Sequence, residues 1–236
     1  RKLPEAEQLA TQQTLEQTLT FLEVVERNES AQQQLQQQLL EAPKQISDAQ
    51  QALQKLLSTV QDDPAKRLAL ASVSELELLL SERNQELQAL QKELGEANSL
   101  IVTAQTRPER AQAEISTNQT RIQEINTLLK NAKEGSKIFS SEKTDALKAE
   151  LLSLESKNNL RRAELAGNSV LQELGSNRRD LLLTKVRLQE QEILALQSLL
   201  NEKRQADSEK TVAELSLEVS KAGSDSLLLR ESGLNL

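Results

Sequence analysis

A single seam of apolar positions runs through the middle of the sequence and restricts the fold to paired helices. Its positions alternate between steps of four and three residues and are Leu76, Leu80, Arg83, Leu87, Leu90, Leu94, Ala97, Ile101 and Ala104, then, beyond Pro108, Ala111, Ile115, Asn118, Ile122, Ile125, Leu129 and Ala132. A spacing of 3.5 residues sustained over this length is typical of a coiled coil, in which each helix buries a narrow stripe against another. We therefore predict an all-α fold of long antiparallel hairpins, or a coiled-coil-like bundle, without β-sheet.

The composition agrees with thin layers between helices and excludes most catalytic chemistry. The chain has two Phe residues and no Trp, Tyr, Met, Cys or His, so Leu, Ile, Val and Ala must form the core. Without His or Cys there is no Ser-His-Asp triad, no thiolate nucleophile and no ordinary zinc site. We predict that the chain is not an enzyme and has no catalytic, cofactor-binding or metal-binding residues and no small-molecule substrate.

The charge balance argues against nucleic acid as a partner, and the hydropathy argues against a transmembrane segment. A net charge of −7 argues against nucleic acid, because nucleic-acid binding requires a basic surface. No run of eighteen apolar residues occurs, so no segment of this sequence is expected to span a bilayer.

Two polar residues occupy positions of the seam itself. Arg83 and Asn118 lie where apolar residues are expected. A polar residue in a seam commonly fixes the register of helix pairing. We interpret both as register markers rather than as parts of a ligand site.

Glycine and proline, which are scarce, mark the expected breaks between helices. The turns are predicted near Pro43 in "EAPKQI" and near Pro108 in "QTRPERAQ", with a further break at Gly167 in "LAGNSVLQ". Gly135 is a candidate helix stop, and Ser74 with Glu77 matches a capping box. The predicted organisation is a first hairpin over 1–61, a second hairpin over about 74–132 within 62–236, and a third helical unit over about 141–222 followed by the truncated start of a further segment.

Pro108 leaves two interpretations open. If it begins a returning helix, seam residues pair across the turn with numbers summing to 215 or 216, so that Leu90 meets Ile125. The seam also stays in phase through Pro108, as it would along one kinked rod. We favour the hairpin, because a rod needs a separate partner for both of its halves.

Several ordered segments resemble a known family. They are "EAPKQI" (41–46), "LIVTAQTRPERAQ" (100–112), "ELAGNSVLQELGSNRRD" (164–180) and "NEKRQADSEKTVAE" (201–214). Together they resemble the periplasmic amino-terminal region of large MscS-like mechanosensitive channels, most closely the potassium-dependent (KefA) type.

The resemblance implies a periplasmic portion of a bacterial inner-membrane protein. Its partners would be other subunits of the same channel, and it would contact the membrane only through downstream segments. The family opens under membrane tension during hypo-osmotic shock, so this portion would be structural or would modulate gating without forming the pore. The alternative, on periodicity alone, is a generic coiled-coil scaffold or adaptor unrelated to a channel.

Overall fold

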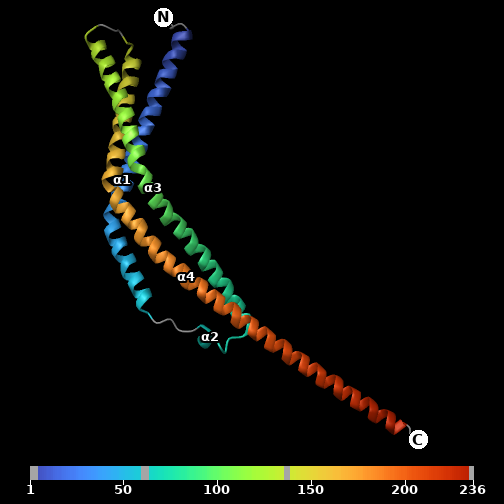
Figure 1. Ribbon diagram of the computed structural model, residues 1–236. Helices are drawn as coiled ribbons and strands as arrows, with labels where there is room; N and C mark the ends of the chain where they lie inside the picture. The colour runs from blue at the N-terminus through green and yellow to red at the C-terminus, as the bar shows by residue number, and fades with distance from the viewer. Residues whose placement is uncertain (1–4, 60–63, 136–138, 234–236) are drawn as a thin grey trace. The chain divides into compact units, whose positions relative to one another are not determined.

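The computed structural model is built almost entirely of long helices (Figure 1). It describes residues 5–59, 64–135 and 139–233, and the side chains of the last helix as far as Lys221. The helices are α1 (Glu5–Ser58), α2 (Pro64–Arg67), α3 (Val73–Lys133) and α4 (Ser141–Gly233). No strand occurs within the described ranges, so the prediction of an all-α fold is confirmed.

The chain forms two compact units, and each contains parts of several helices. The first unit comprises Arg1–Leu53 with Leu94–Leu181, and the second comprises Gln54–Glu93 with Leu182–Leu236. This division differs from the predicted one at residue 61, because α3 and α4 each contribute to both units.

In the first unit, α4 runs parallel to α1. Asn28 of α1 donates a hydrogen bond to Ser156 of α4, and Leu39 contacts Gly167. In each pair the two residues are 128 positions apart in the sequence, so residue numbers increase in the same direction along α1 and α4.

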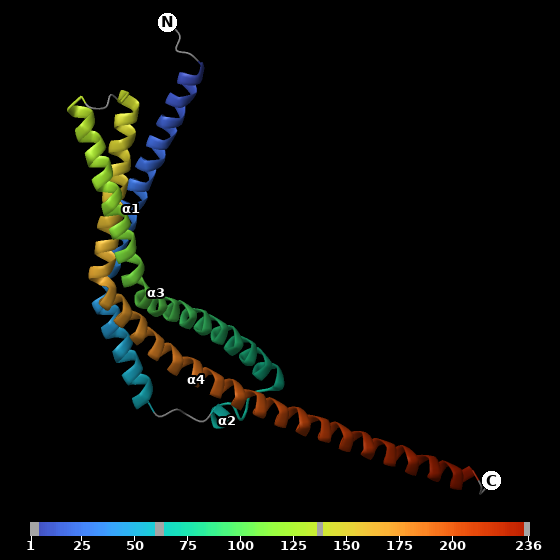
Figure 2. The same ribbon diagram turned by 45° about the horizontal axis from the view of Figure 1, so that its top comes forward.

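The same part of α4 runs antiparallel to α3 (Figure 2). Ala104 contacts Asn168, whereas the later residue Asn118 contacts the earlier residue Asn158. The numbers in these pairs sum to 272 and 276, so α4 pairs with α3 about the connection between Lys133 and Ser141 rather than about Pro108.

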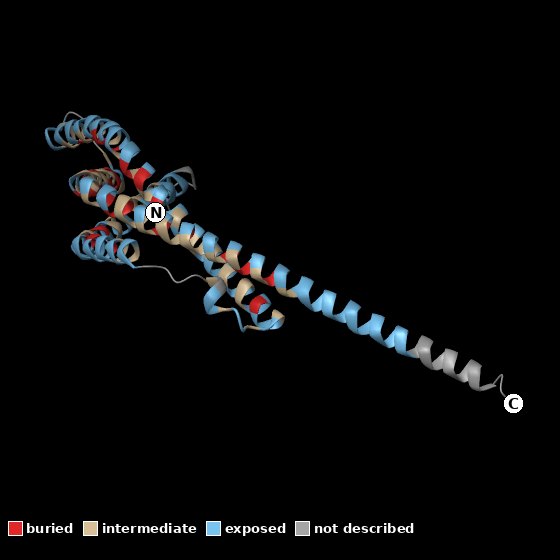
Figure 3. Cartoon of the chain, turned by 60° about the horizontal axis from the view of Figure 1, so that its bottom comes forward, coloured by how far each residue is buried: buried red, intermediate tan, exposed pale blue. Residues whose placement is uncertain are grey.

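The second unit pairs the beginning of α3 with the later part of α4. Leu76, Leu196 and Leu200 form its core, against which Leu68, Ala71, Val73, Leu79, Leu80 and Leu199 pack. Beyond this core, residues 204–221 of α4 are exposed on every side (Figure 3).

The predicted seam of α3 is the buried face of that helix. All its members are buried or half-buried, whereas Pro108, in phase between Ala104 and Ala111, is exposed. The seam was therefore identified correctly, but its partner was not, since α4 covers it rather than a returning half of α3.

The predicted turns at Pro43 and Pro108 are wrong. Pro43 lies inside α1, and Pro108 lies inside α3. An interior proline costs roughly 3 kcal/mol, but each buried Leu or Ile contributes about 1.5–3 kcal/mol. Because α3 finds partners on both sides of Pro108, continuing the helix outweighs that cost. Leu90 and Ile125 therefore lie along one helix and do not face each other.

The predicted break at Gly167 and the end of the third unit near residue 222 are also wrong. Gly167 lies inside α4, which continues to Gly233. Gly167 is buried and has no positive φ, so it serves close packing instead of ending the helix.

Two helix ends are set by local chemistry. Gly135, with φ of 73°, follows the end of α3 as predicted. The capping box at the start of α3 lies two residues before the predicted one. The N–H of Ser72 donates to Glu75 at 2.7 Å, and the N–H of Glu75 donates to the Ser72 hydroxyl at 3.3 Å. Hydrogen bonds from the Ser72 backbone and then its hydroxyl hold the pKa of Glu75 below its ordinary value.

Candidate functional site

Small residues bring the three long helices into close contact within the first unit. Ala42 of α1 is fully buried and packs with Leu174 of α4. At Gly167, an added Cβ would lie 2.5 Å from a methyl carbon of Leu39. We call this contact region, defined by Leu39, Ala42, Ala104, Arg107, Gly167 and Asn168, the helix junction.

Gly175 allows a close approach of α3 to α4. An added Cβ there would lie 2.9 Å from Cγ1 of Ile101 and 3.3 Å from the carbonyl oxygen of Ala97. Because the second of these atoms belongs to the backbone, a side chain could be accommodated only if the helices moved apart. Gly175 therefore sets the spacing of this helix pair.

Asn168 connects the helix junction to Pro108. Its side-chain amide donates to the carbonyl oxygen of Ala104 at 2.8 Å. Its own oxygen accepts a hydrogen bond from Nη1 of Arg107 at 3.1 Å. Ala104 is the residue four before Pro108, so its carbonyl is the one that a proline N–H cannot reach.

The structure brings the three predicted break residues to one region without turning the chain at any of them. Pro43 directly follows the buried residue Ala42. Pro108 lies four residues after Ala104, whose carbonyl accepts the hydrogen bond from Asn168, and Gly167 directly precedes Asn168. Sequence reasoning missed Asn168. Its only signal was a polar residue beside a glycine inside a helical pattern.

The two polar seam positions both contact α4. Asn118 is 7% exposed and donates to Oδ1 of Asn158, itself 3% exposed, at 2.9 Å. Arg83 bonds Glu86 at 2.6 Å and lies 3.4 Å from Glu192 of α4. Sequence reasoning missed Asn158, because the broad apolar face of α4 does not show which of its positions meets Asn118.

Charged pairs flank the seam of the first unit. Arg121 bonds both carboxylate oxygens of Glu150, at 2.7 and 3.0 Å, and these bonds, followed by the one to Glu124, raise the pKa of Arg121 above its ordinary value. Arg161 bonds Glu114 at 2.6 Å and Glu164 at 2.8 Å. The two parallel bonds between Arg121 and Glu150 fix orientation as well as adding energy.

In the second unit, the hydrogen bond to Glu86 is the main cause that raises the pKa of Arg83 above its ordinary value. The same bond, followed by one from Gln189, lowers the pKa of Glu86. Gln189 also donates to the Arg83 carbonyl at 3.0 Å, so the polar groups at this level tie α3 to α4.

A groove of about 280 Å³ lies beside the helix junction and is lined partly by arginines. Its guanidinium groups already have partners: Arg161 bonds two glutamates, Arg107 bonds Asn168, and Arg110 bonds the Thr106 hydroxyl. Each guanidinium group of the groove thus has a hydrogen-bond partner within the chain, and the two glutamates offset the charge of Arg161.

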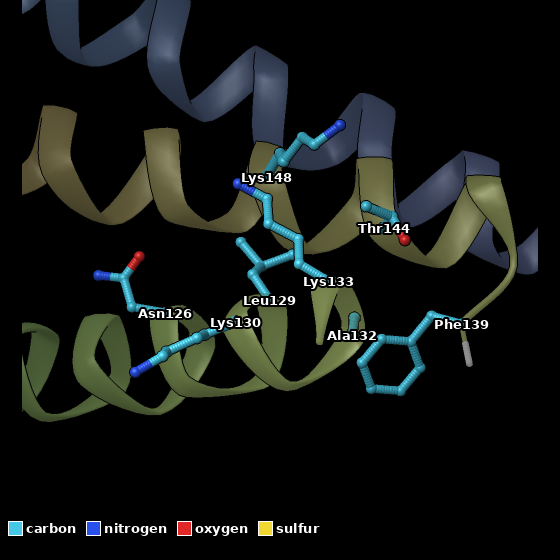
Figure 4. A pocket seen from close by; sticks show the side chains of 8 residues that line it. All are labelled: Asn126, Leu129, Lys130, Ala132, Lys133, Phe139, Thr144 and Lys148. Carbon is cyan, nitrogen blue, oxygen red and sulfur yellow. The ribbon is translucent and has the colours of Figure 1, made fainter. Parts of the chain in front are cut away.

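A larger groove of about 550 Å³ lies where α3 ends and α4 begins (Figure 4). Leu129, Ala132 and Phe139 contribute its apolar lining, and three lysines stand around it. The ammonium group of Lys130 points away from the groove's other lysines (Figure 4). Lys130 also pairs with Glu134, just beyond the end of α3, and Lys148 pairs with Asp145 of α4. The three ammonium groups therefore do not converge on a common ligand position in the groove.

The described side chains include no group of three or more His, Cys, Asp and Glu residues that could hold a metal ion. Nor does any helix, over the residues described, have a stretch long and apolar enough to cross a membrane. The best-defined feature of the described residues is the set of contacts among the long helices.

The comparisons with known proteins agree with the family resemblance. The model of the mechanosensitive ion channel porin domain matches residues 1–230. The mechanosensitive channel MscK of Escherichia coli is 29% identical over 210 residues, which cover 89% of this chain and 19% of that protein. An uncharacterized MscS family protein of Haemophilus influenzae is 32% identical over 164 residues, covering 69% of this chain and 14% of that protein.

The chain thus spans less than a fifth of the length of either relative. No solved structure matches it. Because the family model covers nearly the whole chain, and both relatives are MscS-type proteins, the chain belongs to the mechanosensitive ion channel porin domain family.

Proposed function

We propose that this chain is the periplasmic, helical region of an MscS-type channel in a bacterial inner membrane. In this role it does not form the pore. It contacts other subunits of the same channel and modulates gating during hypo-osmotic shock. The observation that carries the proposal is the porin-domain match over residues 1–230, together with the similarity to MscK.

The architecture supports a mechanical role over a chemical one. The seams of α3 and α4 are buried against partner helices, and the described pockets hold no convergent set of reactive groups. Packed side chains and rigid helices of this kind can carry energetic coupling between distant parts of a protein. A scaffold unrelated to a channel has lost its support, because the chain belongs to a channel family.

The periplasmic location can be tested by labelling single cysteines in the full-length protein. This chain has none of its own. We expect Ser116→Cys, at an exposed position of α3, to react with a membrane-impermeant maleimide in intact spheroplasts. The matched control is Ala111→Cys, because Ala111 is 2% exposed and its replacement should react only after unfolding. Reaction of Ser116→Cys only after the spheroplasts are lysed would contradict a periplasmic location.

A further inference from the structure

Pro108 leaves a buried carbonyl group without its normal helical partner. In an α-helix each carbonyl accepts from the N–H four residues later, and proline has no N–H. The carbonyl in question belongs to Ala104, which is 1% exposed. Water therefore has little access to it, and a buried carbonyl without a donor is costly.

Asn168 of α4 supplies the missing donor. Its amide nitrogen lies 2.8 Å from the Ala104 oxygen, and its oxygen is held by Arg107 at 3.1 Å. The bond to Arg107 orients the amide, so that the nitrogen rather than the oxygen faces the carbonyl. A hydrogen bond that normally lies within one helix is thus made between two.

This exchange couples the shape of α3 to its contact with α4. Helices bend sharply where a proline interrupts the hydrogen-bond ladder. At Pro108, the carbonyl is satisfied only while α4 stays in place. Gly167, next to Asn168, packs against Leu39 of α1, so the same position also connects to the third helix.

We propose that Pro108 and Asn168 form a hinge in α3 whose stiffness depends on α4. While Asn168 donates to Ala104, α3 is held in one shape across Pro108. When α4 moves away, the bond is lost and α3 bends more freely at this point. The inference concerns the chain itself and holds whether or not the chain modulates gating.

Distances between spin labels on either side of Pro108 test the proposal. Ser99 and Ser116 are exposed. The 236-residue chain has no cysteine, so a variant that carries both Ser99→Cys and Ser116→Cys has two labelling sites. Their backbone separation along a helix is about 25 Å at 1.5 Å per residue. We expect a narrow distribution that Asn168→Ala broadens, together with a fall of about 4 °C in the thermal midpoint.

A second variant separates the lost donor from the lost contact with Arg107. Asn168→Asp keeps an acceptor for Arg107 but has no N–H for the Ala104 carbonyl. We expect it to broaden the distribution at least as much as Asn168→Ala does. A narrow distribution in Asn168→Asp would contradict the hinge.

The decisive comparison is made in a Pro108→Ala background, where the helix supplies its own N–H to Ala104. There we expect Asn168→Ala to change neither the distribution nor the midpoint by more than about 1 °C. Asn177→Ala is the matched control in both backgrounds, because Asn177 bonds only a carbonyl of its own helix at 2.9 Å. Equal effects of Asn168→Ala in the two backgrounds would overturn the proposal and leave Asn168 an ordinary packing contact.

Discussion

Gly175→Leu is expected to destabilise the first unit by about 3 kcal/mol, because a side chain at this position forces α3 and α4 apart. A Cβ alone would lie 2.9 Å from Ile101 and 3.3 Å from the Ala97 backbone oxygen. For a chain of this size, that loss corresponds to a fall of about 6–12 °C in the thermal midpoint, measured by circular dichroism.

The matched control for this change is Gly95→Leu. Gly95 also lies inside a helix, but an added Cβ there meets no atom within 4 Å. Leucine is the better helix former by somewhat less than 1 kcal/mol, so this variant should be neutral or slightly stabilising. If both variants change the midpoint equally, the close approach of α3 and α4 at Gly175 is not a real constraint.

Asn118→Leu is expected to cost about 2 kcal/mol, because it leaves the amide of Asn158 buried without its partner. Asn158 is 3% exposed, so water cannot readily replace the lost hydrogen bond. Unfolding in guanidinium chloride measures the loss. Thr117→Leu is the control, since Thr117 is exposed and its hydroxyl bonds only a carbonyl of its own helix. It should stay within about 0.5 kcal/mol of the unchanged chain.

The double variant Asn118→Leu with Asn158→Leu tests why the pair is polar. Replacing both partners with apolar residues removes the unsatisfied amide, so stability should return to near that of the original chain. We propose that Asn118, like Arg83, sets the register of α3 against α4, which is a known role of polar seam residues. If the double variant is as unstable as Asn118→Leu, the unpaired Asn158 amide is not the cause of the lost stability.

The seam of α3 could be predicted from sequence because its period is regular over many turns. Sequence gave no comparable information on what covers it. The helix that pairs with α3 is α4, which begins at Ser141 after α3 has ended, whereas the predicted turn at Pro108 lies within the seam itself. Periodicity identifies the buried face of a helix, but the choice of partner depends on the total contact area of competing arrangements.

The amino-terminal half of α1 shows a second limit of periodicity. Leu15, Leu19 and Leu22 form the most apolar stripe there, yet all are at least 44% exposed. The half-buried positions there include Thr11, Thr14, Thr18 and Phe21. These lie in phase with Leu35, Ala42 and Ile46 further along the helix, so the register of the well-packed half determines which face turns inward.

The helix junction could be located from sequence but not interpreted. Pro43, Pro108 and Gly167 were identified as the unusual positions, and all three lie at or beside it. Their effect was misjudged, because a proline breaks a helix only if the energy of packing does not outweigh the lost hydrogen bond. The compensating donor, Asn168, lies 64 residues from Ala104, beyond the reach of local sequence rules.

Patch-clamp recording of the full-length channel, with and without this segment, tests the central claim most directly. We expect a channel lacking the segment to open with unchanged single-channel conductance but at a different membrane tension, because in the proposed role the segment modulates gating without lining the pore. Loss of conductance, in protein shown to be inserted and assembled, would mean that the segment contributes to the pore. An unchanged conductance at an unchanged opening tension would instead contradict a role in gating.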